Sequence, residues 1–188
     1  MSKKKGGKRD DSYFAADRRR KKKYMMVIIP AVIAVVAVGV VAAILYKPPE
    51  ALAISGVECH TREVTNYHVH SHLDVFVDGQ RKEVPASVGI LSSCLFWLHT
   101  HDGDGIIHVE APSQTEYTLG QFTDIWSQTH SPSKAFFDSL RDEPTAYVNG
   151  IEFVGNYREI PLESRTQIVL VYGNPPAEIP TYDFGSLE

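Results

Sequence analysis

Near its start the chain carries an uninterrupted run of twenty-three uncharged residues, 24–46. The run is rich in Val, Ile and Ala, and lysines flank it on both sides. An α-helix rises about 1.5 Å per residue, so this length is enough to span the roughly 30 Å hydrocarbon core of a membrane. Residues 24–46 are therefore predicted to form a transmembrane helix.

Two other interpretations of this run are a cleaved signal peptide and a buried core helix. A cleaved signal peptide also combines a basic start with an apolar run, and Ala51-Leu52-Ala53 loosely fits a cleavage site. The apolar part of a signal peptide, however, has only about 7 to 15 residues. A buried core helix is the third interpretation, but a domain of this size rarely hides twenty-three uncharged residues in one helix. A retained anchor is the preferred prediction.

Charge is divided unequally around the apolar run. Eleven Lys and Arg against three acidic residues precede Tyr24, a net charge of +8, whereas seven against twenty follow Lys47, a net charge of −13. The positive-inside rule then predicts a cytoplasmic N-terminus and an extracytoplasmic C-terminal domain in the cell membrane. The predicted partner of residues 24–46 is the lipid bilayer, a membrane protein complex is a second candidate partner, and no nucleic acid is expected, because a solvated tail accounts for the basic leader.

The predicted organisation has five parts. Residues 1–23 are a basic cytoplasmic tail, 24–46 the membrane helix, 47–55 a linker, 56–174 a histidine-rich extracytoplasmic domain, and 175–188 an irregular tail rich in proline. The expected fold class is α+β: the single N-terminal transmembrane helix is followed by a mainly antiparallel β domain with one helical segment.

Hydrophobic patterning supports that fold class. Residues 66–77 alternate with period two, which predicts a strand, and Asp78-Gly79 predicts a tight hairpin turn into a return strand. A second hairpin is predicted around a turn at Gly103-Asp104, which pairs Leu98 with Val109, His99 with His108, Thr100 with Ile107 and His101 with Ile106. Further predictions are helical structure within 117–140 and strands at 145–148, 152–154 and 166–172.

The chain has two cysteines, Cys59 and Cys94, and both lie in the predicted outer domain. Disulfides form and persist in the oxidising environment outside the cytoplasm. The pair is therefore predicted to be a disulfide. The alternative is that either thiolate ligates a metal, because histidines lie near both.

Six of the eight histidines fall into two tight groups. One group alternates along the predicted first strand and the other lies in the second hairpin: His68, His70, His72, and His99, His101, His108. Alternate residues of a strand share a face, so imidazoles at these spacings can converge on one ion. The six histidines are the predicted metal ligands, and the possible second-shell residues around them are acidic: Asp74, Asp102, Asp104 and Glu110.

A ligand set of imidazoles favours copper or zinc over calcium or magnesium. No methionine follows Met26, so a blue-copper site with an axial Met is not expected. Asp102 to Gly105 resembles the start of a calcium loop, but a plain turn is the preferred interpretation. The alternative to a metal site is that the histidines only hydrogen-bond one another, and His60 and His130 are interpreted as isolated histidines.

Four motifs carry a resemblance to a known family: HVHSHL from His68, WLHTHD from Trp97, GIIHVE from Gly105 and LGQFTDIW from Leu119. The chain resembles, over about residues 59–172, a family of membrane-anchored extracytoplasmic proteins of bacteria and archaea with HxHxHL and WLHTHD motifs. The resemblance implies location and a shared histidine-rich site, and it implies no activity. The cupin barrel is a weaker alternative, because the next Glu after His101 is Glu110.

These observations together predict a membrane-tethered extracytoplasmic metal-binding protein for copper or zinc, acting in delivery, storage or as an accessory subunit of a membrane complex. One alternative is a metal-dependent enzyme of the cell envelope, with an acidic residue as proton acceptor. The sequence shows no nucleophile elbow or phosphate loop that would favour it. The other alternative is a metal-independent interaction module that uses the aromatic residues of the helical segment: Phe122, Trp126, Phe136 and Phe137.

Overall fold

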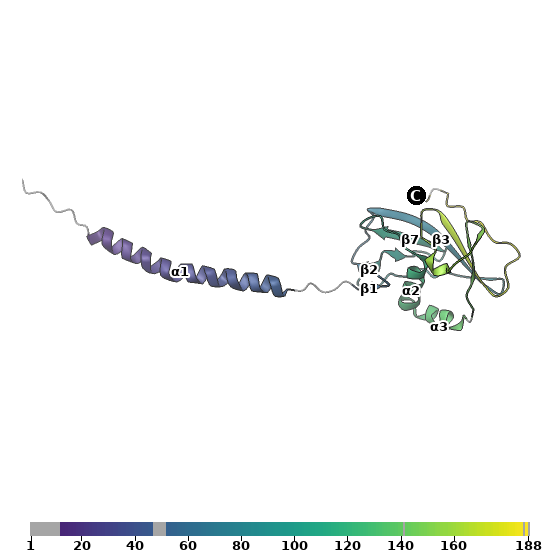
Figure 1. The fold of residues 1–188 in the computed structure, drawn as a ribbon, viewed down its shortest axis with the longest axis horizontal. Helices are drawn as coiled ribbons and strands as arrows, with labels where there is room; N and C mark the ends of the chain where they lie inside the picture. The colour runs from purple at the N-terminus through teal and green to yellow at the C-terminus, as the bar shows by residue number, and fades with distance from the viewer. Residues whose placement is uncertain (1–11, 47–51, 141, 186, 188) are drawn as a thin grey trace, which may run out of the picture. The chain divides into compact units, whose positions relative to one another are not determined.

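The computed structural model describes residues 12–46, 52–140, 142–185 and 187, with side chains from residue 20 onward. The chain divides into two compact units, Met1–Glu50 and Ala51–Glu188 (Figure 1). Each unit has its own secondary structure, and each is described separately below.

The first unit contains one helix, α1 (Ser12–Leu45). Within it, Arg20–Leu45 is long and apolar enough to cross a membrane, a property that signal sequences share. Every side chain of this stretch is exposed, including the valines and isoleucines. A helix that is apolar all round is typical of a membrane-spanning segment.

The second unit is built on one large sheet. Its strand order is β6-β7-β3-β10-β8-β9, and β4 pairs with part of β3. The strands are β3 (Tyr67–Val77), β4 (Gln80–Lys82), β6 (Leu98–His99), β7 (Ile106–Ala111), β8 (Thr145–Val148), β9 (Ile151–Phe153) and β10 (Thr166–Tyr172). All these pairings are antiparallel except the one between β10 and β3.

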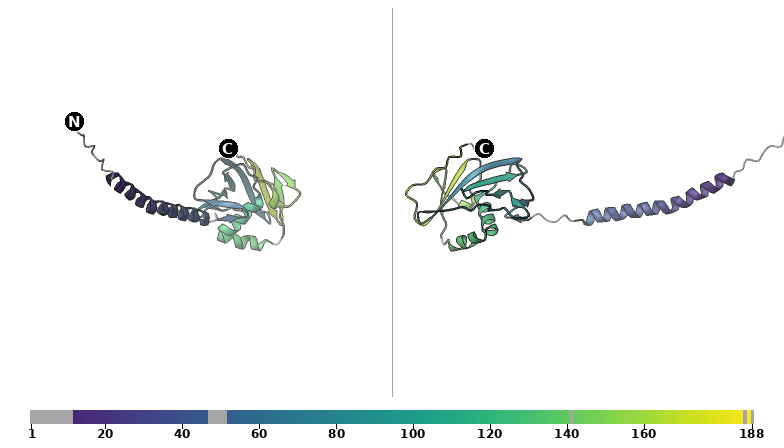
Figure 2. Two further views of the ribbon diagram at one scale, coloured as in Figure 1. Left: turned by 60° about the vertical axis from the view of Figure 1, so that its left-hand side comes forward. Right: turned by 180° about the vertical axis from the view of Figure 1, so that it is seen from behind.

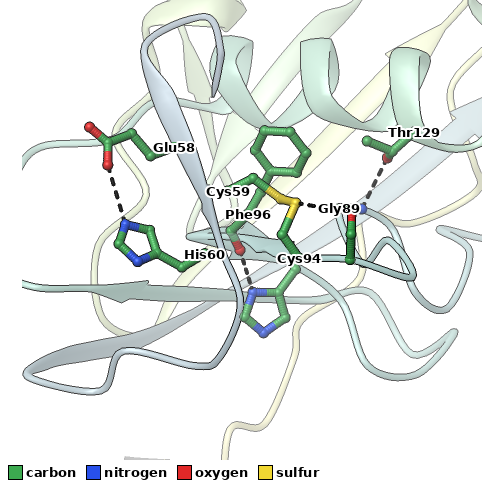
Figure 3. The surroundings of a disulfide bond; sticks show 9 residues. Glu58, Cys59, His60, Gly89, Cys94, Phe96 and Thr129 are labelled. Atoms are coloured by element: carbon green, nitrogen blue, oxygen red, sulfur yellow. Dashed lines mark hydrogen bonds and ion pairs between the residues drawn. A yellow bond between two sulfur atoms is a disulfide. The ribbon is translucent and has the colours of Figure 1, made fainter. Parts of the chain in front are cut away.

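A second, small sheet orders β1 (Ala53–Ile54), β2 (Val57–His60) and β5 (Leu95–Phe96) side by side. The disulfide Cys59–Cys94 joins β2 to the residue before β5, next to Phe96 (Figure 3). The prediction of a disulfide is therefore confirmed. A crosslink over 35 positions contributes on the order of 4 kcal/mol in the chain-entropy account.

Two helices and a short 3-10 turn complete the unit: α2 (Leu119–Thr129), α3 (Ser131–Ser139) and η1 (Tyr157–Glu159). Helix α2 starts after Thr118, whose backbone N–H donates to Oε1 of Gln121 at 2.9 Å, as in a capping box. Pro132 lies in the first turn of α3, where a helix tolerates it. Both helices lie on the same side of the large sheet (Figures 1 and 2).

The two faces of β3 have different environments. Leu73 and Val75 lie in the main core, together with Phe122 and Ile125 of α2 and residues of β7 and β10. The opposite face carries His68, His70, His72, Asp74 and Phe76, because successive side chains of a strand point to opposite sides. A small apolar cluster there consists of Phe76, Val169 and Val171, with the partly buried Tyr147 and Ile179 packed against it. The histidine face is therefore separate from the main core.

The C-terminal segment crosses this second face without forming a helix or strand in residues 175–185. The side-chain amide of Gln167 donates to the carbonyl of Pro180 at 2.9 Å, and the backbone N–H of Tyr182 donates back to Gln167 Oε1 at 3.0 Å. These bonds hold the segment against β10.

The α+β fold class, with an N-terminal apolar helix and a mainly antiparallel sheet domain, is confirmed. Asp78 and Gly79 have positive φ, as the predicted tight turn requires, and Asn149 and Gly150 repeat this geometry between β8 and β9. The sequence predicted that the return strand continues through Glu83, Val84 and Pro85, but β4 ends at Lys82.

The predicted register of the second hairpin holds for Leu98 with Val109 and for His99 with His108. The ladder stops there, so the predicted pairs of Thr100 with Ile107 and of His101 with Ile106 do not form. It stops because Thr100 turns toward the preceding loop: its N–H donates to the carbonyl of Val88 and its hydroxyl to the carbonyl of Pro85.

Candidate metal centre

Three neighbouring strands bring histidines from distant parts of the chain into one row. His108 of β7 is the register partner of His70 in β3 on one side and of His99 in β6 on the other. Directly opposite residues of paired strands have Cβ atoms about 4.5–5.5 Å apart. The row His99–His108–His70 therefore follows from strand pairing. His68 lies beside His70 at one end of the row, and His101 lies beside His99 at the other end.

The first candidate ligand group combines His99, His101, His108 and Glu110. Each residue offers one ligand atom, and these atoms all lie within 4.8 Å of one another. His99 and Glu110 are buried, whereas the side chain of His101 is 40% exposed. The group is therefore anchored inside the domain and open to solvent at one imidazole.

The second candidate group combines His68, His70 and His108, again with ligand atoms within 4.8 Å of one another. His70 Nε2 lies 3.2 Å from His108 Nδ1. The side chain of His68 is 36% exposed, and its Nε2 lies 3.3 Å from Glu110 Oε1. This group also has buried members and one solvent-facing imidazole, and it shares His108 with the first group.

The orientation of His99 is fixed by the backbone. Its Nδ1 lies 2.8 Å from the carbonyl oxygen of Phe96, which can only accept, so Nδ1 carries the proton. The lone pair is then on Nε2, which lies 3.2 Å from Nε2 of His101. Metal-binding histidines are commonly held in this way by a bond from the other ring nitrogen to a carbonyl.

Burial keeps two of these imidazoles neutral. It lowers the pKa of His99 to about 4, and burial together with the neighbouring histidines, His70 first among them, lowers the pKa of His108 to about 3. A neutral imidazole is the form that ligates a metal. Both rings are therefore available as ligands at neutral pH without first losing a proton from a charged form.

Glu110 is the one carboxylate in this group. Burial, and after it the nearby Glu63, raises the pKa of its carboxyl group. Among the described residues, its Oε2 is a buried oxygen without a hydrogen-bond partner. A buried carboxylate oxygen without a partner is costly, and a cation between Glu110 and the imidazoles would remove that cost. The residues present therefore fit a metal ion.

Ring nitrogens also pair with each other, His70 with His108 and His99 with His101. Such pairs are what the simpler alternative predicts. Two observations are not explained by hydrogen-bonded histidine pairs alone. Three or four ligand atoms, not two, lie within 4.8 Å of one another, and Oε2 of Glu110 has no hydrogen-bond partner among the described residues.

His72 lies apart from both groups, although it was predicted as a ligand with the other five. Its ring stacks on Tyr182 of the C-terminal segment, with centroids 3.7 Å apart, and its Nε2 donates to the carbonyl of Asp104 at 3.0 Å. Its Nδ1 faces Asp74 Oδ2 at 3.5 Å. Burial, as the largest cause, lowers the pKa of His72. The C-terminal segment that covers this ring gave no signal in the sequence.

The predicted second-shell acids have different positions. Asp74 forms an ion pair with Arg81 at 2.7 Å and lies beside His72, and it belongs to neither ligand group. Asp104 Oδ1 accepts the N–H of Ile106 at 2.9 Å, so it shapes the turn, and Asp102 is exposed in that turn. Glu110 belongs to the ligand group itself.

One nearby acid was missed by sequence reasoning. Glu63 Oε1 lies 3.6 Å from His101 Nε2. It belongs to the loop between β2 and β3, where no periodicity marks a residue as facing the site.

His60 and His130 lie outside both groups, as interpreted from the sequence. His60 stacks on Trp97 and lies 3.2 Å from Glu58, and His130 Nδ1 lies 2.6 Å from the hydroxyl of Ser133 between the two helices.

A cavity of about 880 Å³ lies between α2, α3 and η1, and no member of the two ligand groups lines it. The ion pair of Arg158 with Asp124, at 2.7 Å, lines it, and none of the histidines does. The cavity is therefore unrelated to the candidate metal centre.

Comparison with protein-family models, curated proteins and solved structures finds no match to this chain. The interpretation of the site therefore depends on its own geometry and chemistry.

Proposed function

We propose that this protein is a membrane-tethered extracytoplasmic metal-binding protein whose ion is held by His99, His101, His108 and Glu110. The observation that carries the proposal is the convergence of three imidazoles and one buried carboxylate within 4.8 Å. Copper and zinc sites are commonly built from four such nitrogen and oxygen ligands.

The chemistry of the ligands supports copper or zinc. Both cysteines are in the disulfide, so neither offers a thiolate. The methionines are Met1, Met25 and Met26, in the other unit of the chain. A site of imidazoles and a carboxylate without sulfur favours the divalent ions Cu²⁺ and Zn²⁺ over Cu⁺.

The proposed location combines three properties. The apolar helix supplies an anchor, the basic leader favours a cytoplasmic N-terminus, and a disulfide is typical of an oxidising compartment. The half-exposed His101 leaves the ion accessible to incoming ligands, which suits delivery or storage. The excess of acidic residues after Lys47 would also raise the local concentration of cations.

Metal affinity of the full-length protein tests this proposal. The chain is purified in detergent without a polyhistidine tag, and its affinities for Zn²⁺ and Cu²⁺ are measured by competition with a chromophoric chelator. His101→Ala removes one ligand from an exposed position and should weaken binding at least about 100-fold, because even outer-shell changes cost 10–100-fold.

His60→Ala is the matched control, since the side chains of His60 and His101 are both 40% exposed. It should leave the affinity unchanged. Absence of tight binding in the unmodified protein, or an equal loss in both variants, would contradict the proposal.

A further inference from the structure

Resting on the proposed function, we infer that the protein binds a second divalent ion at His68 and His70, and that the two ions share His108 as a bridging ligand. The metal centre is then a pair of ions lying along one row of strands.

The row of strands separates the ligands into two sets. His99 and His70 are both register partners of His108, from opposite sides, so two strand spacings lie between them. Each spacing is about 4.8 Å. Ligands of one ion lie within about 4.2 Å of one another, since each metal–nitrogen bond is about 2.1 Å. His99 and His70 accordingly occur in different groups of ligand atoms within 4.8 Å of one another, and we assign them to different ions.

The number of ligands leads to the same conclusion. Five imidazoles and one carboxylate lie in the two groups, more than the four ligands of a typical zinc site. Each group also has its own solvent-facing member, His101 at 40% and His68 at 36% side-chain exposure. An ion can therefore reach each group separately.

His108 can serve both ions because an imidazole has two ring nitrogens. Its Nδ1 lies 3.2 Å from His70 Nε2. We assign its other ring nitrogen, Nε2, to the first group. A neutral ring has one lone pair and one N–H. When both nitrogens ligate, the second metal–nitrogen bond replaces the N–H bond, and the proton passes to solvent.

Charge also permits a pair of ions. The bridging ring becomes an anion, and Glu110 lies between the groups, with Oε1 at 3.3 Å from His68 Nε2 and 3.7 Å from His108 Nδ1. Glu63 adds a third negative group beside His101. These anions reduce the repulsion between two divalent ions.

The test counts ions per chain in the untagged full-length protein in detergent, with Zn²⁺ and separately with Cu²⁺, by titration and elemental analysis after gel filtration. Unmodified protein should bind two ions, and His68→Ala with His70→Ala should bind one. Because His70 is buried, His68→Ala alone is a milder variant; it should weaken the second binding step at least tenfold and leave the first unchanged. His60→Ala should still bind two.

Electron paramagnetic resonance then tests the bridge. Two Cu²⁺ ions joined by one imidazolate couple magnetically, so the integrated signal of the loaded protein should fall below two spins per chain, whereas the double variant should give one full spin. Two full, uncoupled spins would overturn the shared ligand. A single ion in the unmodified protein would overturn the second site and leave the proposed function intact, and no ion would overturn both.

Discussion

The two buried imidazoles of the candidate centre, His99 and His108, make the stability of the folded domain depend on pH. The pKa of His99 is lowered to about 4 and that of His108 to about 3, mainly because burial disfavours the charged ring. An unfolded histidine takes up its proton near pH 6.5. Between these values the unfolded chain therefore binds more protons than the folded chain.

This difference predicts that the metal-free protein loses stability on acidification. The free energy of unfolding should fall from about pH 6.5 downward, by about 3 kcal/mol for each of the two rings at pH 4. The raised pKa of Glu110 acts in the opposite direction, because its folded form takes up a proton earlier, but it is one group against three histidines, since burial also lowers the pKa of His72. Urea unfolding at several pH values, in the presence of a chelator, measures the slope.

His99→Asn should give a shallower slope, whatever it does to absolute stability, because one titrating ring is lost. His60→Ala should retain the full slope, since the ring of His60 belongs to neither group. A stability that stays constant or rises from pH 7 to pH 4 would contradict the account.

At the scale of elements, the turn between β6 and β7 connects the two parts of the first ligand group: His99 and His101 precede it, and His108 and Glu110 follow it. Gly105 has φ +91°, and a Cβ on it would lie 2.6 Å from the carbonyl oxygen of Leu73. Gly150, in the β8–β9 turn, also has positive φ, at +79°, but a Cβ there meets nothing within 4 Å. A side chain at Gly150 would therefore meet backbone strain alone, whereas one at Gly105 would meet backbone strain and a steric clash.

Gly105→Ala should therefore lower the free energy of unfolding by about 2–4 kcal/mol, and Gly150→Ala by only about 1 kcal/mol. Urea unfolding of both variants at pH 7 gives the comparison. Equal effects would show that the close approach to Leu73 does not restrict the turn.

Much of this element level could be predicted from the sequence. The observed β8 and β10 have the predicted bounds, and the pairing of His99 with His108 followed from the alternation around the turn. The parallel pairing of β10 with β3 was not predicted, because the β-branched run 166–172 shows that a strand is buried without showing its neighbour. Tyr182 over His72 and Glu63 beside His101 come from irregular segments, which carry no periodicity.

For the whole molecule, the proposed topology predicts which of the two units a reagent outside the cell can reach. Val154 is 92% exposed, so Val154→Cys should react in intact cells with a membrane-impermeant maleimide. Ser2→Cys should react only after lysis, and on a chain of full length.

Each substitution serves as the control for the other, because both variants are labelled under the same conditions, before and after lysis. Labelling of Val154→Cys only after lysis would contradict the extracytoplasmic domain. A Ser2→Cys chain that never carries label at full length would show a cleaved signal in place of a retained anchor.

The parallel pairing of β10 with β3 also determines when this domain can fold. Strand β3 occupies the centre of the sheet from residue 67, yet its neighbour β10 is complete only at residue 172. Under the proposed topology the N-terminus stays in the cytoplasm and the residues after the membrane helix cross in chain order, so every histidine of the row is outside before β10 has crossed. Sheet closure over such a sequence separation is slow, and under this topology it must follow the passage of nearly the whole C-terminal unit across the membrane.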